Sequence, residues 1–228
     1  MRRTLVLTAI GLLAASPAMA GHDTMKKKGE KPAASPGWVI VEEDYFYPLR
    51  FEADEVFHDA QMHFRRGEEK AAANEITRAA SWLNFAASHG YPETQKDLKA
   101  AATELTSLAK DLRAGNLVAA SRIDSVLARS AHALATWHYF MAQQSLAKDE
   151  MTFAAQDLQA ASVYLQSAAK SAHLEYGAGA VAMFEDVDRD GRAVDEGVTI
   201  EPNRVQSHLD AIKAELNKLS ATLKKDAA

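Results

Sequence analysis

Three carboxylates at alternate positions, followed by a glycine, form the most specific motif in the sequence, DVDRDG. Its acidic residues and glycine are Asp186, Asp188, Asp190 and Gly191. In EF-hand-like loops, oxygen ligands at positions 1, 3 and 5 converge because the chain wraps around calcium, and glycine at position 6 permits the sharp turn. Position 12, normally a bidentate Glu, is Gly197, so Glu196, Glu201 or water would have to complete the site. The motif predicts either a calcium site that orders a loop at about 185–201 or a solvated acidic loop.

A histidine and a methionine one helical turn apart, His138 and Met141, lie on the apolar stripe of the longest expected helix. Imidazole and thioether groups bind copper, and on opposite helices they can hold the axial positions of a b-type haem. A single histidine on an apolar stripe can equally be a hydrogen-bonded core residue. His58 and Met62 lie similarly close, and Glu55 precedes His58 as in diiron bundles, but the sequence has no second Glu-x-x-His element. The cofactor-binding candidates are therefore His138 and Met141.

The composition excludes several classes of chemistry. The chain has no cysteine, which excludes thiol nucleophiles, zinc-thiolate sites and iron-sulfur clusters. A net charge of -5 argues against a nucleic-acid partner, because such a partner requires a basic face. The sequence has no glycine-rich phosphate loop, nucleophile elbow or His-Glu-x-x-His motif. We therefore expect a protein that is not an enzyme and has no firmly bound cofactor.

Residues 1–20 have the three parts of a signal peptide. A short cationic start precedes an apolar stretch at 4–13, and AMA at 18–20 fits a cleavage site. Residues 21–37 combine Lys, Gly, Pro and Ala without periodicity, as flexible linkers do. The sequence thus predicts an exported protein, periplasmic or secreted, with no stable membrane span after cleavage.

One stretch, residues 130–147, contains no Asp, Glu, Lys or Arg over eighteen residues. A helix on the surface of a bundle carries charge on its outer face, so this one should be surrounded by other helices or by a second subunit. It is too polar to cross a bilayer, because it contains two histidines and two glutamines. We predict that it is the second half of a long central helix at about 116–148.

Apolar residues at three-and-four spacing predict helices along most of the chain from residue 51. About six helices are expected, at 51–66, 68–88, 92–114, 117–148, 150–176 and from 203 onward. The segment at 38–47 lacks helical spacing and should be extended across the bundle, with 198–200 as a candidate strand partner. The prediction is an all-α bundle in a single domain, 38–228.

Turn residues mark the expected helix ends. Gly90 suits a left-handed C-cap, and Pro92 suits the first turn of the next helix. Asn116 and Asp149 should cap the helices that follow them, and Asn203 begins a capping-box pattern. These signals divide the chain into helical hairpins.

A weak internal repeat follows three of these turns. AAANEI at 71–76, VAASRI at 118–123 and FAAQDL at 153–158 share an Ala-Ala-x-x-Ile/Leu core. Small residues at the start of a hairpin's second helix let the two backbones approach closely. We therefore expect three related α-hairpins around the central helix.

Two segments resemble the YfdX family of exported helical proteins: VEEDYFYPLRFEADEVFHDAQMHFRRGEEKAAANEITRAA and LAKDEMTFAAQDLQAASVYL. The resemblance implies a periplasmic, all-helical, oligomeric protein linked to stress responses, without known enzymatic chemistry. The DVDRDG motif is not a feature that the resemblance implies.

Together these features predict a non-enzymatic binding or interaction protein with a stress-protective role. It would present an apolar helix face or groove to another copy of itself or to an envelope protein. The alternative is a metal- or haem-binding bundle, with calcium at the DVDRDG loop or copper or haem at His138. The exposure of residues 130–147 bears on this choice: if one chain covers them, their aromatic side chains belong to the core and the interaction hypothesis loses its main support.

Overall fold

The computed structural model describes residues 5–8, 38–41 and 52–225, and the chain divides into two compact units, Met1–Leu49 and Arg50–Ala228. In the first unit, strands β1 (Leu5–Thr8) and β2 (Trp38–Val41) pair in antiparallel fashion. The register sets Leu5 opposite Val41 and Thr8 opposite Trp38.

The predicted extended segment is therefore present at 38–41, but its strand partner is β1 instead of residues 198–200. It also belongs to the compact unit Met1–Leu49, which is separate from the unit that contains the helices. The bounds of the single domain, 38–228, stay a prediction. The expected cleavage site, the linker at 21–37 and the remainder of the extended segment lie outside the described residues.

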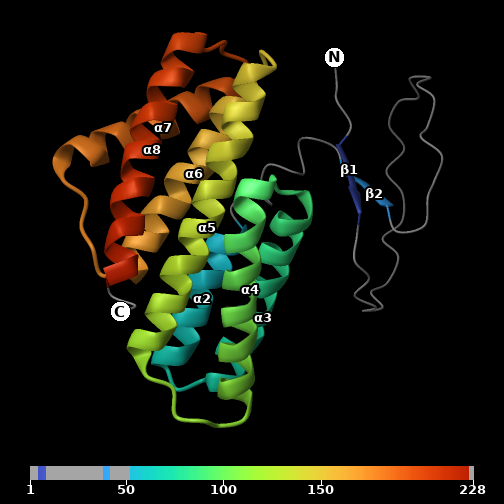
Figure 1. The fold of residues 1–228 in the computed structure, drawn as a ribbon, viewed down its shortest axis with the longest axis vertical. Helices are drawn as coiled ribbons and strands as arrows, with labels where there is room; N and C mark the ends of the chain where they lie inside the picture. Colours follow the sequence, from blue (N-terminus) through green and yellow to red (C-terminus); the bar gives the residue numbers. More distant parts are fainter. Residues whose placement is uncertain (1–4, 9–37, 42–51, 226–228) are drawn as a thin grey trace. The chain divides into compact units, whose positions relative to one another are not determined.

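The second unit contains seven helices among its described residues, which run up and down beside one another (Figure 1). They are α2 (Glu52–Arg65), α3 (Glu69–His89), α4 (Pro92–Arg113), α5 (Ala120–Ala147), α6 (Met151–Ser171), α7 (Ala178–Asp195) and α8 (Pro202–Lys225). The all-α prediction is confirmed, and the additional helix, α7, occupies a region expected to be a loop. None of the described helices combines the length and apolar character needed to cross a membrane.

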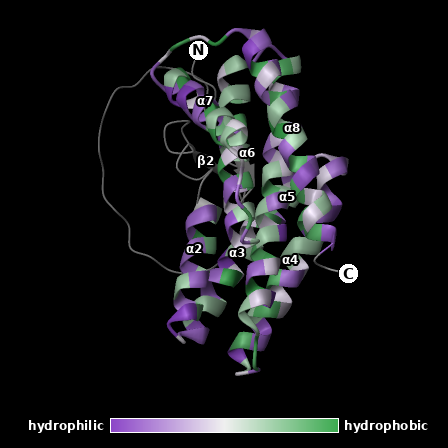
Figure 2. Cartoon of the chain, turned by 90° about the vertical axis from the view of Figure 1, so that its left-hand side faces the viewer, coloured by the Kyte–Doolittle hydropathy of each residue, from purple (hydrophilic) through white to green (hydrophobic). Residues whose placement is uncertain are grey.

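The predicted apolar stripes meet in one hydrophobic core. The seam of α8 is buried along its whole length, at Val205, Leu209, Ile212, Leu216, Leu219 and Leu223. This seam packs on α5 and α6 of the same chain, and α3 packs along α2 and α4. Hydrophobic and hydrophilic residues alternate around the helices in Figure 2, as expected for amphipathic helices that share one core.

The charge-free stretch belongs to α5, which has 28 residues and would be about 42 Å long if straight. Helices α4, α6 and α8 all pack against it. Between residues 130 and 147, only Gln144 and Ala147 are exposed. The prediction of a central helix is confirmed, although α5 begins at Ala120, several residues later than expected.

Helix α6 is as central as α5, which the sequence analysis missed. Every residue from 154 to 162 is buried. The sequence did contain a signal, because α6 carries only two charged side chains, Asp157 and Lys170, in 21 residues. The repeat motif that begins it places a buried alanine pair at 154–155, whereas the equivalent pair at 119–120 is exposed. The packing reason for the repeat therefore does not hold for its second copy.

Five helices end with the same backbone motif, in which one residue adopts the left-handed conformation. The left-handed residues, with φ from 56° to 87°, are Gly67, Gly115, Asp149, His173 and Gly197. In each case the next backbone N–H donates to a carbonyl five residues earlier, as from Glu68 to His63. This Schellman geometry satisfies carbonyls at the ends of α2, α4, α5, α6 and α7.

The left-handed cap predicted at Gly90 is wrong, because Gly90 is extended, with φ −82° and ψ 162°. Glycine fits there for another reason: a Cβ atom would lie 2.8 Å from the carbonyl oxygen of Ala86. Pro92 begins α4, as predicted.

The predicted N-caps are wrong as well. Asn116 donates its side-chain amide to Asp111 (3.1 Å) at the end of α4. Asp149 is the left-handed residue two positions before α6, and Asn203 lies inside α8. Short polar side chains bond to backbone and neighbours at either kind of helix end, so the sequence did not show which end each one serves.

Among the described residues, Asp149 is one of two with a side chain in the left-handed conformation, and it gives a direct stability test. Replacement of Asp149 by glycine should raise the free energy of unfolding by about 0.5–1 kcal/mol, because glycine adopts positive φ without steric cost. Urea denaturation of the two proteins measures the change. Replacement of Gly67 by alanine tests the opposite change. The added Cβ atom would lie in open space, so the free energy of unfolding should fall by about 1 kcal/mol through backbone strain alone. Equal stability of the variants and the parent would contradict this account of the turns.

Candidate functional site

The DVDRDG motif is helical. It lies inside α7. The loop predicted at about 185–201 is therefore wrong for residues 185–195, which are helical. Successive helical residues point about 100° apart, so Asp188 points away from Asp186 and Asp190, which lie one turn apart on the same side of α7. The three carboxylates therefore do not converge on one ion. Glu196 follows as the C-cap residue of α7.

Each of the three carboxylates has its own partner. Asp186 pairs with Arg189 on the same helix (2.6 Å), and Asp188 accepts a hydrogen bond from Gln159 of α6 (2.8 Å). Asp190 faces α8. Within the described ranges, no three His, Asp or Glu side chains are grouped so that they could hold a metal ion. Calcium binding at this motif stays a prediction, but the wrapped loop on which it rested is not formed.

The glycine of the motif serves helix packing. Phe184, Val187, Gly191 and Val194 form the buried stripe of α7. A Cβ atom on Gly191 would lie 2.6 Å from Cδ of Gln159 and 2.9 Å from its Cβ. Gly191 therefore permits α7 to approach α6 closely, and the same approach allows Gln159 to reach Asp188.

Substitution of Gly191 by alanine should lower the free energy of unfolding by about 1–2 kcal/mol, because the added methyl group overpacks the contact with Gln159. Chemical denaturation measures this. Gly179→Ala is the matched control on the same helix, since nothing lies within 4 Å of a Cβ there, and it should be neutral or stabilising. A destabilisation equal at the two positions would show that packing against α6 is not the cause.

Asp190 connects α7 to α8 through two side chains that the sequence analysis did not single out. His208 Nε2 donates to Asp190 Oδ2 (2.8 Å), and Arg204 donates through Nε to Oδ2 and through Nη2 to Oδ1 (3.0 Å). Burial alone would raise the pKa of Asp190, but the hydrogen bonds from Arg204 and His208 outweigh it and hold the pKa below its ordinary value. The carboxylate is thus kept charged where the two helices meet.

His138 has the environment of a hydrogen-bonded core residue. It is 4% exposed, and its Nδ1 donates to Oδ1 of Asp157 on α6 (3.0 Å). Its ring stacks on Tyr164, with ring centroids 5.5 Å apart and planes 10° apart. Met141 is only partly buried. The structure thus joins His138 to Asp157 and Tyr164, two residues of α6 that the sequence analysis missed.

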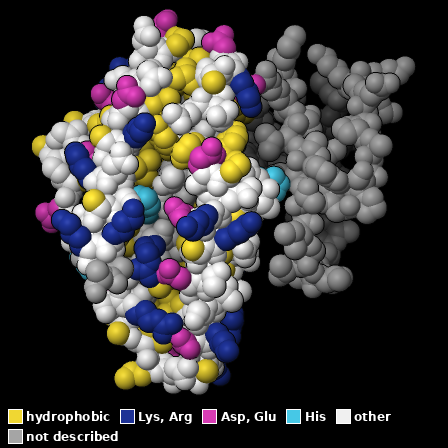
Figure 3. Space-filling model, in the orientation of Figure 1, with side chains coloured by type: hydrophobic (Ala, Val, Ile, Leu, Met, Phe, Trp, Pro, Cys, Tyr) yellow, Lys and Arg dark blue, Asp and Glu magenta, His cyan; other side chains and the backbone are white. Residues whose placement is uncertain are grey.

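A groove runs along α5 between α4 and α8. It encloses about 250 Å³, and we call it the α5 groove. Its floor is Arg129, His132 and Ala133 of α5, and its walls are Asp97, Ala100, Ala101 and Glu104 of α4 and Ser220, Leu223 and Lys224 of α8. Thr136 and Phe140 are half-buried one and two turns further along α5. Hydrophobic side chains lie among mixed charges on this face of the unit (Figure 3).

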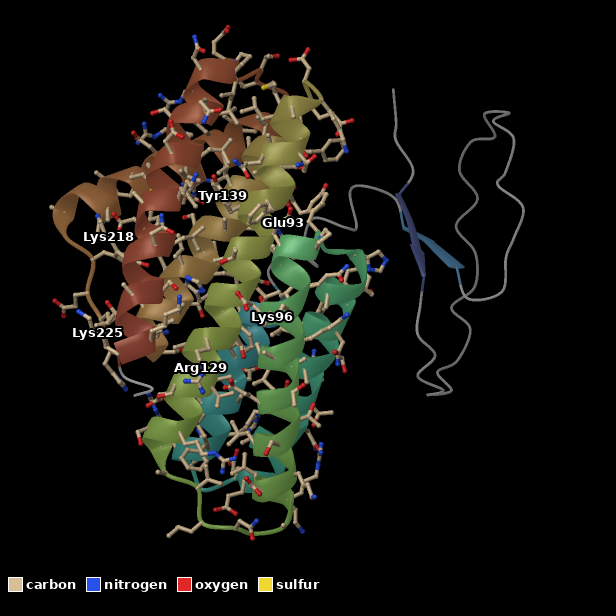
Figure 4. All side chains as sticks on the ribbon, in the orientation of Figure 1. Glu93, Lys96, Arg129, Tyr139, Lys218 and Lys225 are labelled. Atoms are coloured by element: carbon tan, nitrogen blue, oxygen red, sulfur yellow. The ribbon has the colours of Figure 1, made fainter. Side chains whose placement is uncertain are left out.

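The polar groups of the floor have partners within the chain. Arg129 donates to Oε2 of Glu104 through Nε (2.9 Å) and Nη2 (2.5 Å). His132 Nε2 donates to the carbonyl oxygen of Leu216 (3.1 Å). Burial lowers the pKa of His132, although the hydrogen bond to Leu216 and the charge of Asp97 at the α4 wall act in the opposite direction. Figure 4 labels Arg129 on α5, with Glu93 and Lys96 on α4 and Lys218 and Lys225 on α8.

The lowered pKa of His132 makes stability depend on pH. The folded state favours the neutral ring, so its stabilisation is complete above the ordinary value of 6.5 and is lost as the pH falls toward the lowered folded value. Replacement of His132 by Gln, whose amide can still donate to Leu216, should reduce the loss of stability between pH 7 and pH 5 by roughly 1 kcal/mol. Thermal unfolding across this range tests the expectation. His58→Gln, at an exposed position, is the control and should leave the pH profile unchanged.

Other hollows are formed by the described part of the helical unit. One of about 320 Å³ lies between α2 and α6 and includes exposed His58, and one of about 360 Å³ lies between the α6–α7 turn and α8. Neither gives access to α5. The α5 groove therefore corresponds best to the predicted presentation of a helix face.

The open question of whether one chain covers residues 130–147 is answered by their burial. Tyr139 is 6% exposed, and Trp137 and Phe140 are partly buried against the core. These aromatic residues belong to the core of one chain, so the interaction hypothesis loses the support that it drew from them. What remains is the narrower α5 groove.

Comparisons with known proteins give no assignment. No protein-family model matches the chain, and neither a curated protein nor a solved structure matches it. The resemblance to the YfdX family stays a prediction.

Proposed function

We propose that this protein is an exported, non-enzymatic helical binding protein that accommodates a polypeptide partner in the α5 groove. The observation that carries the proposal is the groove itself: a partly apolar floor on the central helix between an acidic wall and a basic wall. Grooves between helices commonly receive a helix whose apolar face meets the floor. A stress-protective role rests on the family resemblance alone.

The charge of the groove favours a polypeptide over a small anion or cation. Asp97 and Glu104 line the α4 wall, and Lys224 lines the α8 wall. A ligand of one sign would be attracted by one wall and repelled by the other. A helix with acidic and basic edges can match both walls. The titratable groups of the floor are engaged with Glu104 and with the Leu216 carbonyl, which supports a binding role over catalysis.

Site-specific photo-crosslinking in cells tests the groove. A photoreactive amino acid at Ala100, an exposed residue of the α4 wall, should give a discrete crosslinked product. The same amino acid at Thr106 is the control. Thr106 is also exposed, but its side chain points about 120° away from that of Ala100 around the axis of α4, so it should give no crosslinked product. Equal crosslinking at both positions, or none at Ala100, would contradict a partner in the groove.

Export is a separate part of the proposal and has its own test. Protein recovered from the periplasmic or extracellular fraction should have the mass of a chain that begins at Gly21. Replacement of Ala18 and Ala20 by large residues should block this processing. A full-length chain that remains in the cytoplasm would contradict the assignment.

The alternative, a metal or haem protein, has less support. His138 Nδ1 is bonded to Asp157, and one face of its ring is covered by Tyr164. The sequence motif for calcium is helical. Elemental analysis and a visible spectrum of protein purified without chelator test the alternative directly, and stoichiometric copper or a Soret band would establish it.

A further inference from the structure

We propose that the hollow between α2 and α6 binds a small zwitterion, an amino acid or a short peptide that carries one ammonium and one carboxylate group. The hollow encloses about 320 Å³, and we call it the α2–α6 pocket. This volume lies at the lower end of the range of small-molecule sites. The pocket shares no lining residue with the α5 groove, so this inference does not depend on the proposed function.

Two groups of opposite charge line the α2–α6 pocket without a protein partner. Asp54 lies on α2, and Lys170 lies on α6. Within the described part of the chain, the side chains of Asp54, Lys170 and the neighbouring His58 form no ion pair and no hydrogen bond. A ligand with a single charge would be attracted by one of the two ends and repelled by the other. A zwitterion can bind Asp54 through its ammonium group and Lys170 through its carboxylate group.

The register of the two helices sets the distance between these charged residues. Short turns reverse the chain after α2, α3, α4 and α5, so α2 and α6 run in the same direction (Figure 1). Gln61 Nε2 donates to Ser171 Oγ (3.3 Å), which places these two residues at the same level. Asp54 lies seven residues before Gln61, and Lys170 lies one residue before Ser171. Asp54 and Lys170 are therefore about 9 Å apart along the helix axes, at about 1.5 Å per residue.

This distance suits a small zwitterion. When both side chains extend across the pocket, a free α-amino acid spans it, because the ammonium nitrogen and carboxylate oxygen are about 3 Å apart and each end adds a hydrogen bond of about 2.8 Å. A dipeptide is about 3.5 Å longer, which the flexible Lys170 side chain can accommodate. The α2 side of the pocket covers only the two turns from Asp54 to Gln61, which is too short for a helical partner.

Other polar groups of the pocket can bind the same ligand. His58 and Ser167 lie within one helical turn of the level of Lys170, and both side chains can donate a hydrogen bond to the carboxylate group. Gln61 is 8% exposed, and its hydrogen bonds within the described residues are donated by Nε2. Its Oε1 is therefore available to accept a hydrogen bond from a ligand N–H.

Isothermal titration calorimetry of the full chain with L-alanine and with L-alanyl-L-alanine tests the proposal. At least one of the two should bind with a dissociation constant of about 1 mM or lower. N-acetyl-L-alanine lacks the ammonium group and L-alaninamide lacks the carboxylate group, so each should bind at least about tenfold more weakly than L-alanine. Binding of L-alanine alone would identify the ligand class as amino acids, and binding of the dipeptide alone would identify it as short peptides.

Variants of the pocket distinguish this site from nonspecific binding at the surface. Asp54→Asn and Lys170→Gln should each weaken binding by at least about tenfold, because each removes one charged partner and nearly preserves the shape of the side chain. Ser167→Phe retains both charges but fills the pocket, and it should abolish binding. Asp59→Asn on α2 and Lys213→Gln on α8 are the matched controls, since both residues are exposed and lie outside the pocket lining.

The two control variants should bind like the parent, and circular dichroism should show that all variants are folded. No binding of either zwitterion at about 10 mM would overturn the proposal. It would also be overturned by equal binding of the singly charged analogues, or by pocket variants that bind as well as the control variants do.

Discussion

Replacement of Asp157 by alanine should lower the free energy of unfolding by about 3 kcal/mol, which is the largest effect that we expect from a single side chain. Asp157 and His138 are 6% and 4% exposed, and they join α5 to α6, the two most buried helices, through one 3.0 Å hydrogen bond. Truncation would leave the His138 Nδ1–H buried without an acceptor. Urea denaturation at pH 7 gives the value.

A double-mutant cycle distinguishes loss of this hydrogen bond from loss of packing. His138→Phe alone should destabilise, because it leaves the Asp157 carboxylate buried without a donor. The pair His138→Phe with Asp157→Leu replaces both polar groups by apolar ones of similar shape and should recover most of the stability. Asp157→Asn, which can still accept the hydrogen bond, should cost less than alanine. Additive effects in the cycle would show that the two side chains do not interact energetically.

Replacement of Asp190 by alanine should cost about 2 kcal/mol at neutral pH and should remove part of the acid sensitivity of the protein. The pKa of Asp190 in the folded state lies below its value in the unfolded chain. The stabilisation is therefore complete above the unfolded value, near 3.8, and is lost as the pH falls through the lowered folded value. Unfolding free energies measured from pH 7 to pH 2 should converge for parent and variant at the acidic end.

Asp186→Ala is the matched control for Asp190. Asp186 lies one turn earlier on α7 at a partly exposed position, where it pairs with Arg189 on that helix and acts on Arg204 through its charge alone, without a hydrogen bond. An exposed pair of this kind contributes less than about 1 kcal/mol. Acid profiles that differ from the parent equally in the two variants would show that the connection from α7 to α8 through Arg204 and His208 is not the source of the effect.

The helices could be predicted from the sequence because their apolar stripes repeat every three or four residues, as in the seam of α8. Helix α7 was not predicted from its apolar stripe. Glycine and aspartate have low helix propensity, and DVDRDG matched a loop motif, so local preference indicated a loop. The stripe Phe184, Val187, Gly191 and Val194 was present in the sequence, and its burial against the core overrides that preference.

For the candidate sites too, single residues could be selected from the sequence, but their partners could not. His138 could be selected from the sequence because it interrupts an apolar stripe, but its partner Asp157 lies nineteen residues away on another helix. Asp190 was selected for calcium, whereas Arg204 and His208 hold it. Such pairings depend on which helix faces meet, and no local spacing records that.

The sequence by itself determined that the chain is helical, that residues 130–147 lie at the centre of the bundle and that no thiol chemistry is present. Composition and periodicity are properties of single segments, so they could be read without a fold. The tertiary structure decided that DVDRDG is a helix packed on Gln159, that the aromatics of α5 are core, and that oppositely charged walls flank one groove. These features arise from contacts between distant segments, and the free energy of each contact depends on burial that only the folded chain creates.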